Sequence, residues 1–239
     1  MKQALVTGGS GGIGAAICRR LAADGHHVLI HANSNIQTAK TLAAELNAGG
    51  YSAQPVGFDI TNHDEVVAAL KPLTEQTPIQ ILINNAGIHD DAAFPGMTPQ
   101  QWQRVIDVSV NGFYHVTHTL MMPMIRTRWG RIVNLSSIAA ISGNRGQVNY
   151  AAAKGAINSA TRSLALELAS RGITVNAVAP GIIDTAMSRS AFDADAVARL
   201  VPMKRAGTPA EVADLIGFLV SPQAAYITGQ IISVNGGMI

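Results

Sequence analysis

The stretch QALVTGGSGGIG, residues 3–14, decides the fold class of this 239-residue chain. A short apolar run leads into a glycine-rich turn, and Ile13, Ile17 and Leu21 then recur every four residues, as on the buried side of a helix. Glycines at a strand–turn–helix junction let the backbone approach a pyrophosphate, and the helix N-terminus supplies free N–H groups and a positive dipole end. The stretch therefore predicts a dinucleotide-binding turn at the start of an α/β fold.

Two glycine registers fit this turn. Gly9, Gly11 and Gly14 spell G-x-G-x-x-G, whereas Gly8, Gly12 and Gly14 spell G-x-x-x-G-x-G. A tight turn without any ligand is the alternative. No Lys-Ser/Thr pair follows the glycines, which argues against a nucleotide-hydrolysing P-loop.

The rest of the chain alternates short apolar runs with helical patterns. The expected strands cover 3–7, 27–32, 52–59, 79–85, 130–137, 173–180 and 230–236, and the main expected helices cover 36–48, 63–73, 108–127 and 208–220. Strands this apolar are covered on both faces, which is typical of a parallel sheet between two helical layers. We therefore predict a doubly wound α/β fold with about seven parallel strands, helices on both faces, and a single domain spanning 1–239.

Composition excludes several other classes. The net charge is +2, from 17 basic and 15 acidic residues, which is too small an excess for a nucleic-acid-binding surface. No apolar run reaches the length of a membrane span. Cys18 is the only cysteine, so no intrachain disulfide is possible, and we expect a cytoplasmic protein. His115 and His118 lack further ligands nearby in the sequence, so we expect no metal site.

The stretch HANSN, residues 31–35, lies where dinucleotide sites read the adenosine ribose. An acid would hold the 2′-hydroxyl of NAD, but none is present. Asn33 and Ser34 can donate hydrogen bonds to a 2′-phosphate, which favours NADP; the alternative is that they only cap the helix beginning near Ile36. The turn NNAG, residues 84–87, follows the fourth strand at the expected ligand crevice.

A second cluster carries the chemistry. In VNYAAAKGA, residues 148–156, Tyr150 and Lys154 are four apart, about 6 Å along one helix face. An ammonium close to a phenol favours its ionised form by up to about three pKa units. The pair is thus a candidate proton donor with its tuning charge, although an exposed helix face is the alternative. Ser137 ends the fifth strand and can orient a carbonyl, with Ser136 as the alternative serine.

The combination of TGGSGGIG, NNAG, Ser137, the 150–154 stretch YAAAK and Pro180-Gly181 resembles the short-chain dehydrogenase/reductase family over the whole chain. Within that family, GQVNYAAAKGAI and AAYITGQIISVNGGM look most like the 3-oxoacyl-acyl-carrier-protein reductases of fatty-acid synthesis.

The resemblance implies a Rossmann-type sheet, a homotetramer, and NADPH-dependent reduction of 3-oxoacyl thioesters. It gives Tyr150 the role of proton donor, Lys154 that of lowering the phenol pKa and holding the nicotinamide ribose, and Ser137 that of positioning the carbonyl. The implied cofactor contacts are Gly8, Ser10, Gly12, Ile13 and Gly14 at the pyrophosphate, Asp59 and Ile60 at adenine, Asn85, Ala86 and Gly87 at the ribose, and Pro180, Gly181, Ile183 and Thr185 at the nicotinamide.

Two positions depart from the family pattern. The fourth catalytic position, an asparagine in the family, falls on Ser109, and Asn111 lies two residues later as a possible substitute. Relatives that prefer NADP often carry a basic residue in the glycine turn, where this chain has Gly11. A weakly catalytic NADP-binding subunit is therefore one alternative function, and reduction of another ketone, such as a polyketide intermediate, steroid or sugar, is a second.

Two further features concern substrate and partner. The segment 184–205 resembles the family's substrate lid, with an acyl channel or ordinary packing as equal interpretations of Met187, Phe192, Leu200 and Met203. Arg128 and Arg171 fall where relatives present positive charge to acidic acyl carrier protein, although surface arginines are usually just solvated.

Overall fold

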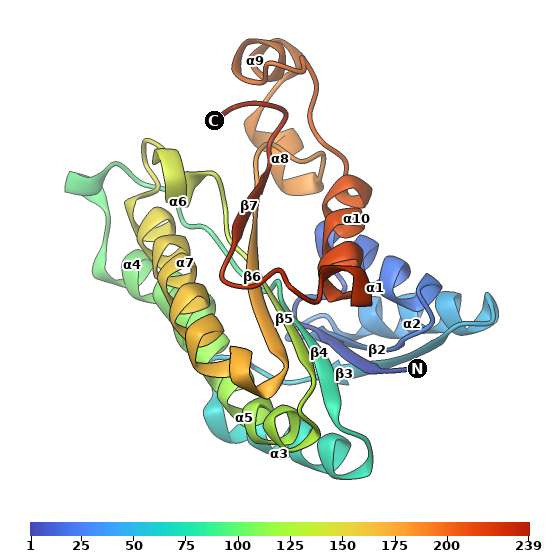
Figure 1. Ribbon diagram of the computed structural model, residues 1–239. Helices are drawn as coiled ribbons and strands as arrows, with labels where there is room; N and C mark the ends of the chain where they lie inside the picture. The colour runs from blue at the N-terminus through green and yellow to red at the C-terminus, as the bar shows by residue number, and fades with distance from the viewer.

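The computed structural model describes the backbone of residues 1–239 and all side chains except those of Met187, Ser190 and Ala191. Its centre is one seven-stranded parallel sheet with strand order β3-β2-β1-β4-β5-β6-β7 (Figure 1). The strands are β1 Gln3–Val6, β2 His27–Ala32, β3 Ser52–Gly57, β4 Ile79–Asn84, β5 Gly130–Leu135, β6 Ile173–Pro180 and β7 Ile231–Val234. The predicted doubly wound parallel sheet is confirmed.

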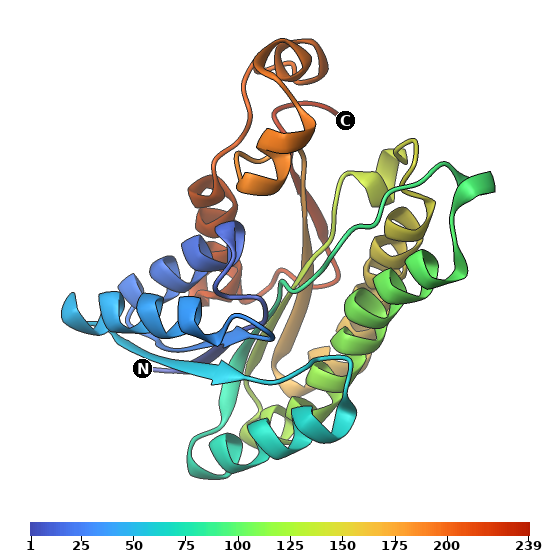
Figure 2. The ribbon, with the colours of Figure 1, turned by 180° about the vertical axis from the view of Figure 1, so that it is seen from behind.

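Helices cover both faces of the sheet (Figure 1, Figure 2). One face carries α1 Gly12–Ala23, α2 Ile36–Ala48 and α10 Pro209–Val220; the other carries α3 His63–Gln76, α5 Gly112–Thr127 and α7 Val148–Leu168. The remaining helices are the short α4 Pro99–Ile106, α6 Ala139–Ser142, α8 Ala186–Ala191 and α9 Ala194–Leu200. Across the described residues, no helix is both long and apolar enough to span a bilayer.

Each strand divides its side chains between the two helical layers. Ile81 and Ile83 of β4 pack in the core beneath α1, α2 and α10, whereas Leu82 between them packs beneath α3, α5 and α7. All three are fully buried. The period of two places successive side chains on opposite faces, so an uninterrupted apolar run is what a strand covered on both faces requires.

The sheet order places a crevice between β1 and β4. β1 pairs with β2 on one side and with β4 on the other, so the chain winds outward in opposite directions from this point. In open parallel sheets, ligands bind beyond the carboxyl ends of the strands at such a reversal. The glycine turn after β1 and the 84–87 turn after β4 both lie there.

Local signals set the helix starts. Thr98 and Thr208 each form a capping box, with Gln101 and Glu211 respectively, and a proline opens each helix. The helix expected from about residue 108 instead continues α4 through a π-helical turn, Asp107–Asn111, before α5. Such turns often occur at functional sites, and here the turn contains Ser109.

Candidate active site

Several glycines of the turn that follows β1 have no room for a side chain. Gly8 has φ +60°, and a Cβ on Gly14 would overlap the carbonyl oxygen of Gly8 and stand 2.9 Å from the Cα of Gly9. A Cβ on Gly9 would meet the Val6 carbonyl oxygen at 2.9 Å. At Gly11, by contrast, the nearest atom would be 3.6 Å away. The turn therefore needs glycine at positions 8, 9 and 14, but tolerates a side chain at 11.

No side chain caps the N–H groups at the N-terminus of α1. Gly11 is its N-cap, and no side chain caps the first turn. Ser10 and Ile13 beside it are half-buried, and Gly12 is exposed. Uncapped N–H groups at a helix start favour an anionic ligand. The residues present therefore fit the predicted pyrophosphate site.

Thr7 fastens the glycine turn to the turn after β4. Its Oγ1 donates to the Ile83 carbonyl at 3.3 Å and accepts from the backbone N–H groups of Asn85 and Ala86, both at 3.0 Å. The Asn85 side chain in turn donates to the carbonyls of Thr7, at 2.9 Å, and Gly8, at 3.0 Å. Thr7 lay within the predicted motif, but its role in joining the two turns was missed.

Asn33 and Ser34, the predicted donors to the 2′-phosphate, do not cap α2. Asn35, rather than Asn33 or Ser34, caps α2 by accepting from the Thr38 N–H at 3.4 Å. Asn33 and Ser34 are both exposed. Their capping interpretation is therefore wrong, and the NADP interpretation stays a prediction.

The turn after β3 is ordered by its own side chains. Asp59 accepts from the Thr61 N–H and hydroxyl, both at 2.8 Å. Ile60 is 5% exposed, and a Cβ on Gly112 of α5 would come within 2.7 Å of its Cδ1. The two residues predicted to face adenine thus lie in a turn fixed against α5.

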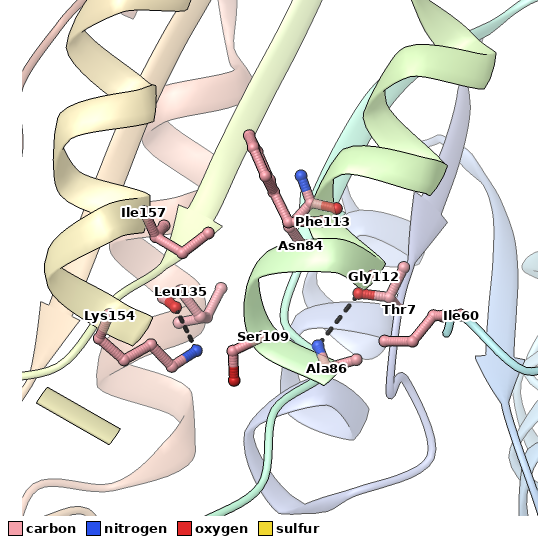
Figure 3. A pocket seen from close by; sticks show the side chains of 10 residues that line it. All are labelled: Thr7, Ile60, Asn84, Ala86, Ser109, Gly112, Phe113, Leu135, Lys154 and Ile157. Atoms are coloured by element: carbon pink, nitrogen blue, oxygen red, sulfur yellow. Dashed lines mark hydrogen bonds between the residues drawn. The ribbon is translucent and has the colours of Figure 1, made fainter. Parts of the chain in front are cut away.

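Lys154 reaches from α7 into the crevice. The residue is only 4% exposed, and its Nζ donates to the Leu135 carbonyl at 2.7 Å (Figure 3). Burial lowers the pKa of Lys154 to about 8. Its Nζ stands 5.8 Å from the ring centroid of Tyr150.

Tyr150 differs from the expectation in one respect. Burial raises the pKa of Tyr150, the hydrogen bond with Ser137 acts in the opposite direction, and the charge of Asp91 raises the pKa further. The sequence predicted that Lys154 would lower this pKa. In the structure, burial is the largest influence on this pKa, and the Lys154 Nζ bonds to the Leu135 backbone carbonyl.

The two candidate serines have separate roles. Ser136 is buried, and its Oγ donates to the Lys154 carbonyl at 3.5 Å, so it supports α7. Ser137 is half-buried, and its hydroxyl acts on the Tyr150 phenol to lower the pKa of that group. Its Oγ also accepts from the Ala139 N–H at 3.1 Å. Of the two, Ser137 is the serine that lies beside the phenol.

Ser109 faces the same cavity as Lys154 (Figure 3). Its Oγ is buried, and no described group pairs with it. Asn111, the possible substitute, instead donates to Asp107 at 2.7 Å on the exposed side of the helix. A Cβ on Gly87 would stand 3.1 Å from the Lys154 Nζ and 3.8 Å from the Ser109 Oγ, so this glycine keeps the space between them open.

The predicted nicotinamide-side residues follow β6. Pro180 ends the strand, and a Cβ on Gly181 would lie 2.8 Å from that of Asn235. Ile183 bridges Gly207. Thr185 caps α8. It also lies next to the start of α1, since a Cβ on Gly12 would come within 3.1 Å of the Thr185 Cγ2. The fold thus brings residues from the two ends of the sequence to one crevice.

The apolar candidates of the segment 184–205 differ in exposure. Leu200 is 50% exposed and Met203 61%, Phe192 is half-buried, and the side chain of Met187 lies outside the described residues. The segment with α8 and α9 extends from one end of the molecule (Figure 1). Among the described side chains, no group of three or more His, Cys, Asp or Glu is arranged to hold a metal ion.

Arg128 and Arg171 lie at the other edge of the sheet. Both are exposed, and they immediately precede β5 and β6, whereas Ser137 follows the end of β5. The Arg128 guanidinium donates to the Ser170 carbonyl at 3.0 Å. β5 extends about 20 Å at roughly 3.3 Å per residue, so this arginine pair is remote from the crevice of its own chain.

A glycine turn at an uncapped helix N-terminus lies near Ser137, Tyr150 and Lys154, an arrangement typical of an oxidoreductase that acts on the CH–OH/C=O group with a dinucleotide. The chain belongs to the short-chain dehydrogenase/reductase family. A family model described as enoyl-(acyl carrier protein) reductase matches residues 8–239.

Curated relatives match over nearly the full chain. A 3-oxoacyl-[acyl-carrier-protein] reductase FabG of Aggregatibacter actinomycetemcomitans is 43% identical, covering 98% of each protein. An acetoacetyl-CoA reductase of Rhizobium meliloti is 43% identical, covering 99% of this chain and 98% of the relative. Nodulation protein G of Rhizobium sp. (strain N33) is 42% identical, covering 99% and 96%.

Proposed function

We propose that this protein is an NADPH-dependent reductase of 3-oxoacyl thioesters, with residues 1–239 acting as one cofactor-binding domain. The overall reaction converts a 3-oxoacyl thioester, NADPH and a proton into a 3-hydroxyacyl thioester and NADP⁺. The names of two similar proteins, a 3-oxoacyl-carrier-protein reductase and an acetoacetyl-CoA reductase, share this substrate class. The placement of the Ser137 hydroxyl, which lowers the pKa of the Tyr150 phenol, beside the buried Lys154 is the observation that carries the proposal.

In the proposed mechanism, the Tyr150 hydroxyl donates its proton to the ketone oxygen. Ser137 donates a second hydrogen bond to that oxygen, which favours the charge that develops on it. A nicotinamide dinucleotide held in this crevice would supply the hydride that the ketone carbon receives. Because burial raises its pKa, the phenol stays protonated near neutral pH and is ready to act as an acid.

The chain provides a matching cradle for the cofactor. The uncapped start of α1 would hold the pyrophosphate, and Asn33 and Ser34 would bind the 2′-phosphate. Lys154 would hold the nicotinamide ribose through its ammonium. A lysine with a pKa near 8 and no carboxylate partner gains acceptors from a sugar, which favours its charged form.

The test is NADPH consumption, followed at the nicotinamide absorbance band, with acetoacetyl thioester as substrate. We expect oxidation with NADPH and a much lower rate with NADH at equal concentration. Activity with NADH alone would overturn the proposed role of Asn33 and Ser34. NADPH binding without oxidation of any ketone would instead support the weakly catalytic subunit, the alternative that the unpartnered Ser109 hydroxyl favours.

The same assay separates ketone from alkene reduction, because the matching family model is described as an enoyl reductase. A crotonyl thioester offers a C=C bond and a thioester carbonyl, but no 3-oxo group. We expect no NADPH oxidation with it, since Ser137 and Tyr150 converge on one oxygen at the reacting carbon. Turnover of the crotonyl thioester above that of the acetoacetyl thioester would contradict the proposal.

For the carrier partner, we propose that acyl carrier protein docks on Arg128 and Arg171 within a homotetramer. Because the pair lies at the far edge of its own sheet, a carrier bound there would serve the crevice of a neighbouring chain. Arg128→Glu should raise KM for the carrier-bound substrate about tenfold and leave KM for the CoA ester unchanged. Equal effects on both substrates would contradict carrier docking.

A further inference from the structure

His31 connects the glycine turn to the turn that follows β3. The residue is 2% exposed and lies at the carboxyl end of β2. Its Nδ1 accepts from the Gly8 N–H at 3.0 Å, and its Nε2 lies 2.9 Å from the Phe58 carbonyl oxygen. Its own carbonyl accepts from the Gly9 N–H at 2.8 Å. Thus one imidazole spans the segments expected to hold the pyrophosphate and the adenine.

The two partners define the protonation state of the ring. A backbone N–H can only donate, so Nδ1 must carry a lone pair toward Gly8. A backbone carbonyl can only accept, so Nε2 must carry the proton toward Phe58. Only the neutral Nε2–H tautomer satisfies both contacts, and an imidazolium would place an N–H against the N–H of Gly8.

The surroundings favour that neutral form. Burial lowers the pKa of His31, whereas the hydrogen bond to Phe58 and the charge of Asp59 act in the opposite direction. The ring also packs on Phe58, with centroids 4.1 Å apart. Among the described residues, Asp59 is the charged group that acts on His31, and its carboxylate is occupied by Thr61.

We propose that His31 is a positioning residue for the dinucleotide: its neutral imidazole holds Gly8 in the conformation that binds the pyrophosphate and couples it to the adenine-side turn. This inference rests on the proposed cofactor site. It differs from a merely structural role because the conformation of Gly8, φ +60°, sets the path of the turn that leads to the uncapped N-terminus of α1.

Two substitutions separate the contacts. In His31→Asn, the amide oxygen takes the place of Nδ1 and keeps the acceptor for Gly8. In His31→Gln, the amide nitrogen takes the place of Nε2 and keeps the donor for Phe58, but the Gly8 N–H loses its partner. We expect His31→Gln to raise the NADPH Kd about tenfold, equivalent to about 1.4 kcal/mol, with kcat at saturating NADPH reduced less than twofold. His31→Asn should raise Kd less than threefold.

The matched control is His27→Gln, in the same strand. His27 Nδ1 contacts the Ser52 Oγ at 2.7 Å and lies at the opposite end of β2 from the glycine turn. Its NADPH Kd should equal that of the wild type. Equal Kd values for His31→Gln and wild type, or a larger loss in His31→Asn than in His31→Gln, would overturn the proposal. Failure of the wild type to bind NADPH would instead overturn the proposed function.

A measurement on the wild-type protein covers the case in which a variant fails to fold. ¹⁵N NMR of the histidine side chains, with the His31 signals assigned through their correlation with the His31 backbone resonances, reports the tautomer directly. We expect a protonated Nε2 and an unprotonated Nδ1 at pH 7.5. An imidazolium, or a proton on Nδ1, at that pH would overturn the proposal.

Discussion

The crevice has two ends, the phosphate end at the glycine turn 8–14 and the chemical end around Tyr150 and Lys154. Their polar groups find hydrogen-bond partners in different ways. At the phosphate end, Thr7 and Asn85 tie the glycine turn to the turn after β4 through hydrogen bonds within the protein. At the chemical end, the Ser109 hydroxyl has no partner among the described groups, and the Lys154 ammonium bonds only to a backbone carbonyl. The phosphate end is therefore preorganised, and we propose that the charges at the chemical end depend on the ligand that binds there.

This difference separates binding from chemistry. A preorganised turn loses little conformational entropy when a ligand arrives. A buried lysine without a carboxylate is partly neutral near pH 8, so its charge depends on the acceptors that a ligand supplies. Changes at the phosphate end should alter affinity, and changes at the chemical end should alter rate and pH dependence.

The largest expected effect is at the chemical end. Tyr150→Phe removes the proton donor and should lower kcat at least about 10³-fold, within the range for general acid catalysis. The NADPH Kd, measured by fluorescence titration, should change less than threefold. Tyr114→Phe, at an exposed tyrosine of α5, is the control and should match the wild type. A Tyr150→Phe variant with a near-normal rate would end this account of the chemistry.

Lys154→Met tests the charge state without the cofactor. In the folded protein the Lys154 pKa is about 8, against 10.5 for an ordinary lysine, so only the unfolded state holds this proton between those values. The unfolding free energy of the wild type, relative to Lys154→Met, should therefore rise by about 3 kcal/mol from pH 8 to pH 10.5. Denaturant unfolding at several pH values measures this difference.

The unfolding experiment on Lys154→Met needs a control at an exposed lysine. Lys40→Met, at an exposed position of α2, controls for the general loss of a positive charge. Its difference from the wild type should stay constant over the same pH range. A constant difference for Lys154→Met as well would contradict the burial of an unpaired ammonium.

Gly14→Ala tests the phosphate end. A Cβ at this position overlaps the Gly8 carbonyl, so the turn must shift, at a cost of about 1–3 kcal/mol in unfolding free energy. NADPH affinity should fall at least about tenfold. Gly11→Ala, where the nearest atom would be 3.6 Å away, is the control in the same turn. Equal stability and affinity in the two variants would show that the turn is not sterically fixed.

The smallest effect concerns cofactor choice. Asn33→Asp places a carboxylate where the 2′-phosphate of NADPH is proposed to lie, and repulsion should lower the NADPH-to-NADH preference in kcat/KM about tenfold. Steady-state kinetics with both cofactors measure the change. The capping residue Asn35 is not altered, so α2 should keep its stability. An unchanged preference would place the 2′-phosphate elsewhere.

Most of the fold could be predicted because its signals are local. The strand 173–180 and the helix 36–48 agree with the structure residue for residue, since a strand buried on both faces is mostly apolar and the helical pattern begins directly at Ile36. The π-helical turn Asp107–Asn111 could not be predicted, because it depends on how α4 and the turn itself pack against α7.

The sequence predicted that Tyr150 and Lys154 lie together at the candidate site, but it did not predict the direction of the Tyr150 pKa shift. Spacing along one helix places Tyr150 and Lys154 on one face, yet it carries no information about hydration. Burial reverses the expected direction of the Tyr150 pKa shift. The link from His31 to Gly8 crosses 23 positions of sequence, and only the pairing of β2 beside β1 brings it about.

The ionisation of Tyr150 with and without cofactor tests most directly whether ligand binding sets the charges at the chemical end. Tyrosinate absorbance, taken as the difference between wild type and Tyr150→Phe, is followed against pH. Without cofactor, we predict that Tyr150 ionises above pH 10, because burial raises its pKa. With NADP⁺ bound, the nicotinamide charge and a fully charged Lys154 should bring the pKa down by at least about one unit. The same pKa in both states, or ionisation below pH 8 without cofactor, would contradict the claim that ligand binding sets the charges at the chemical end.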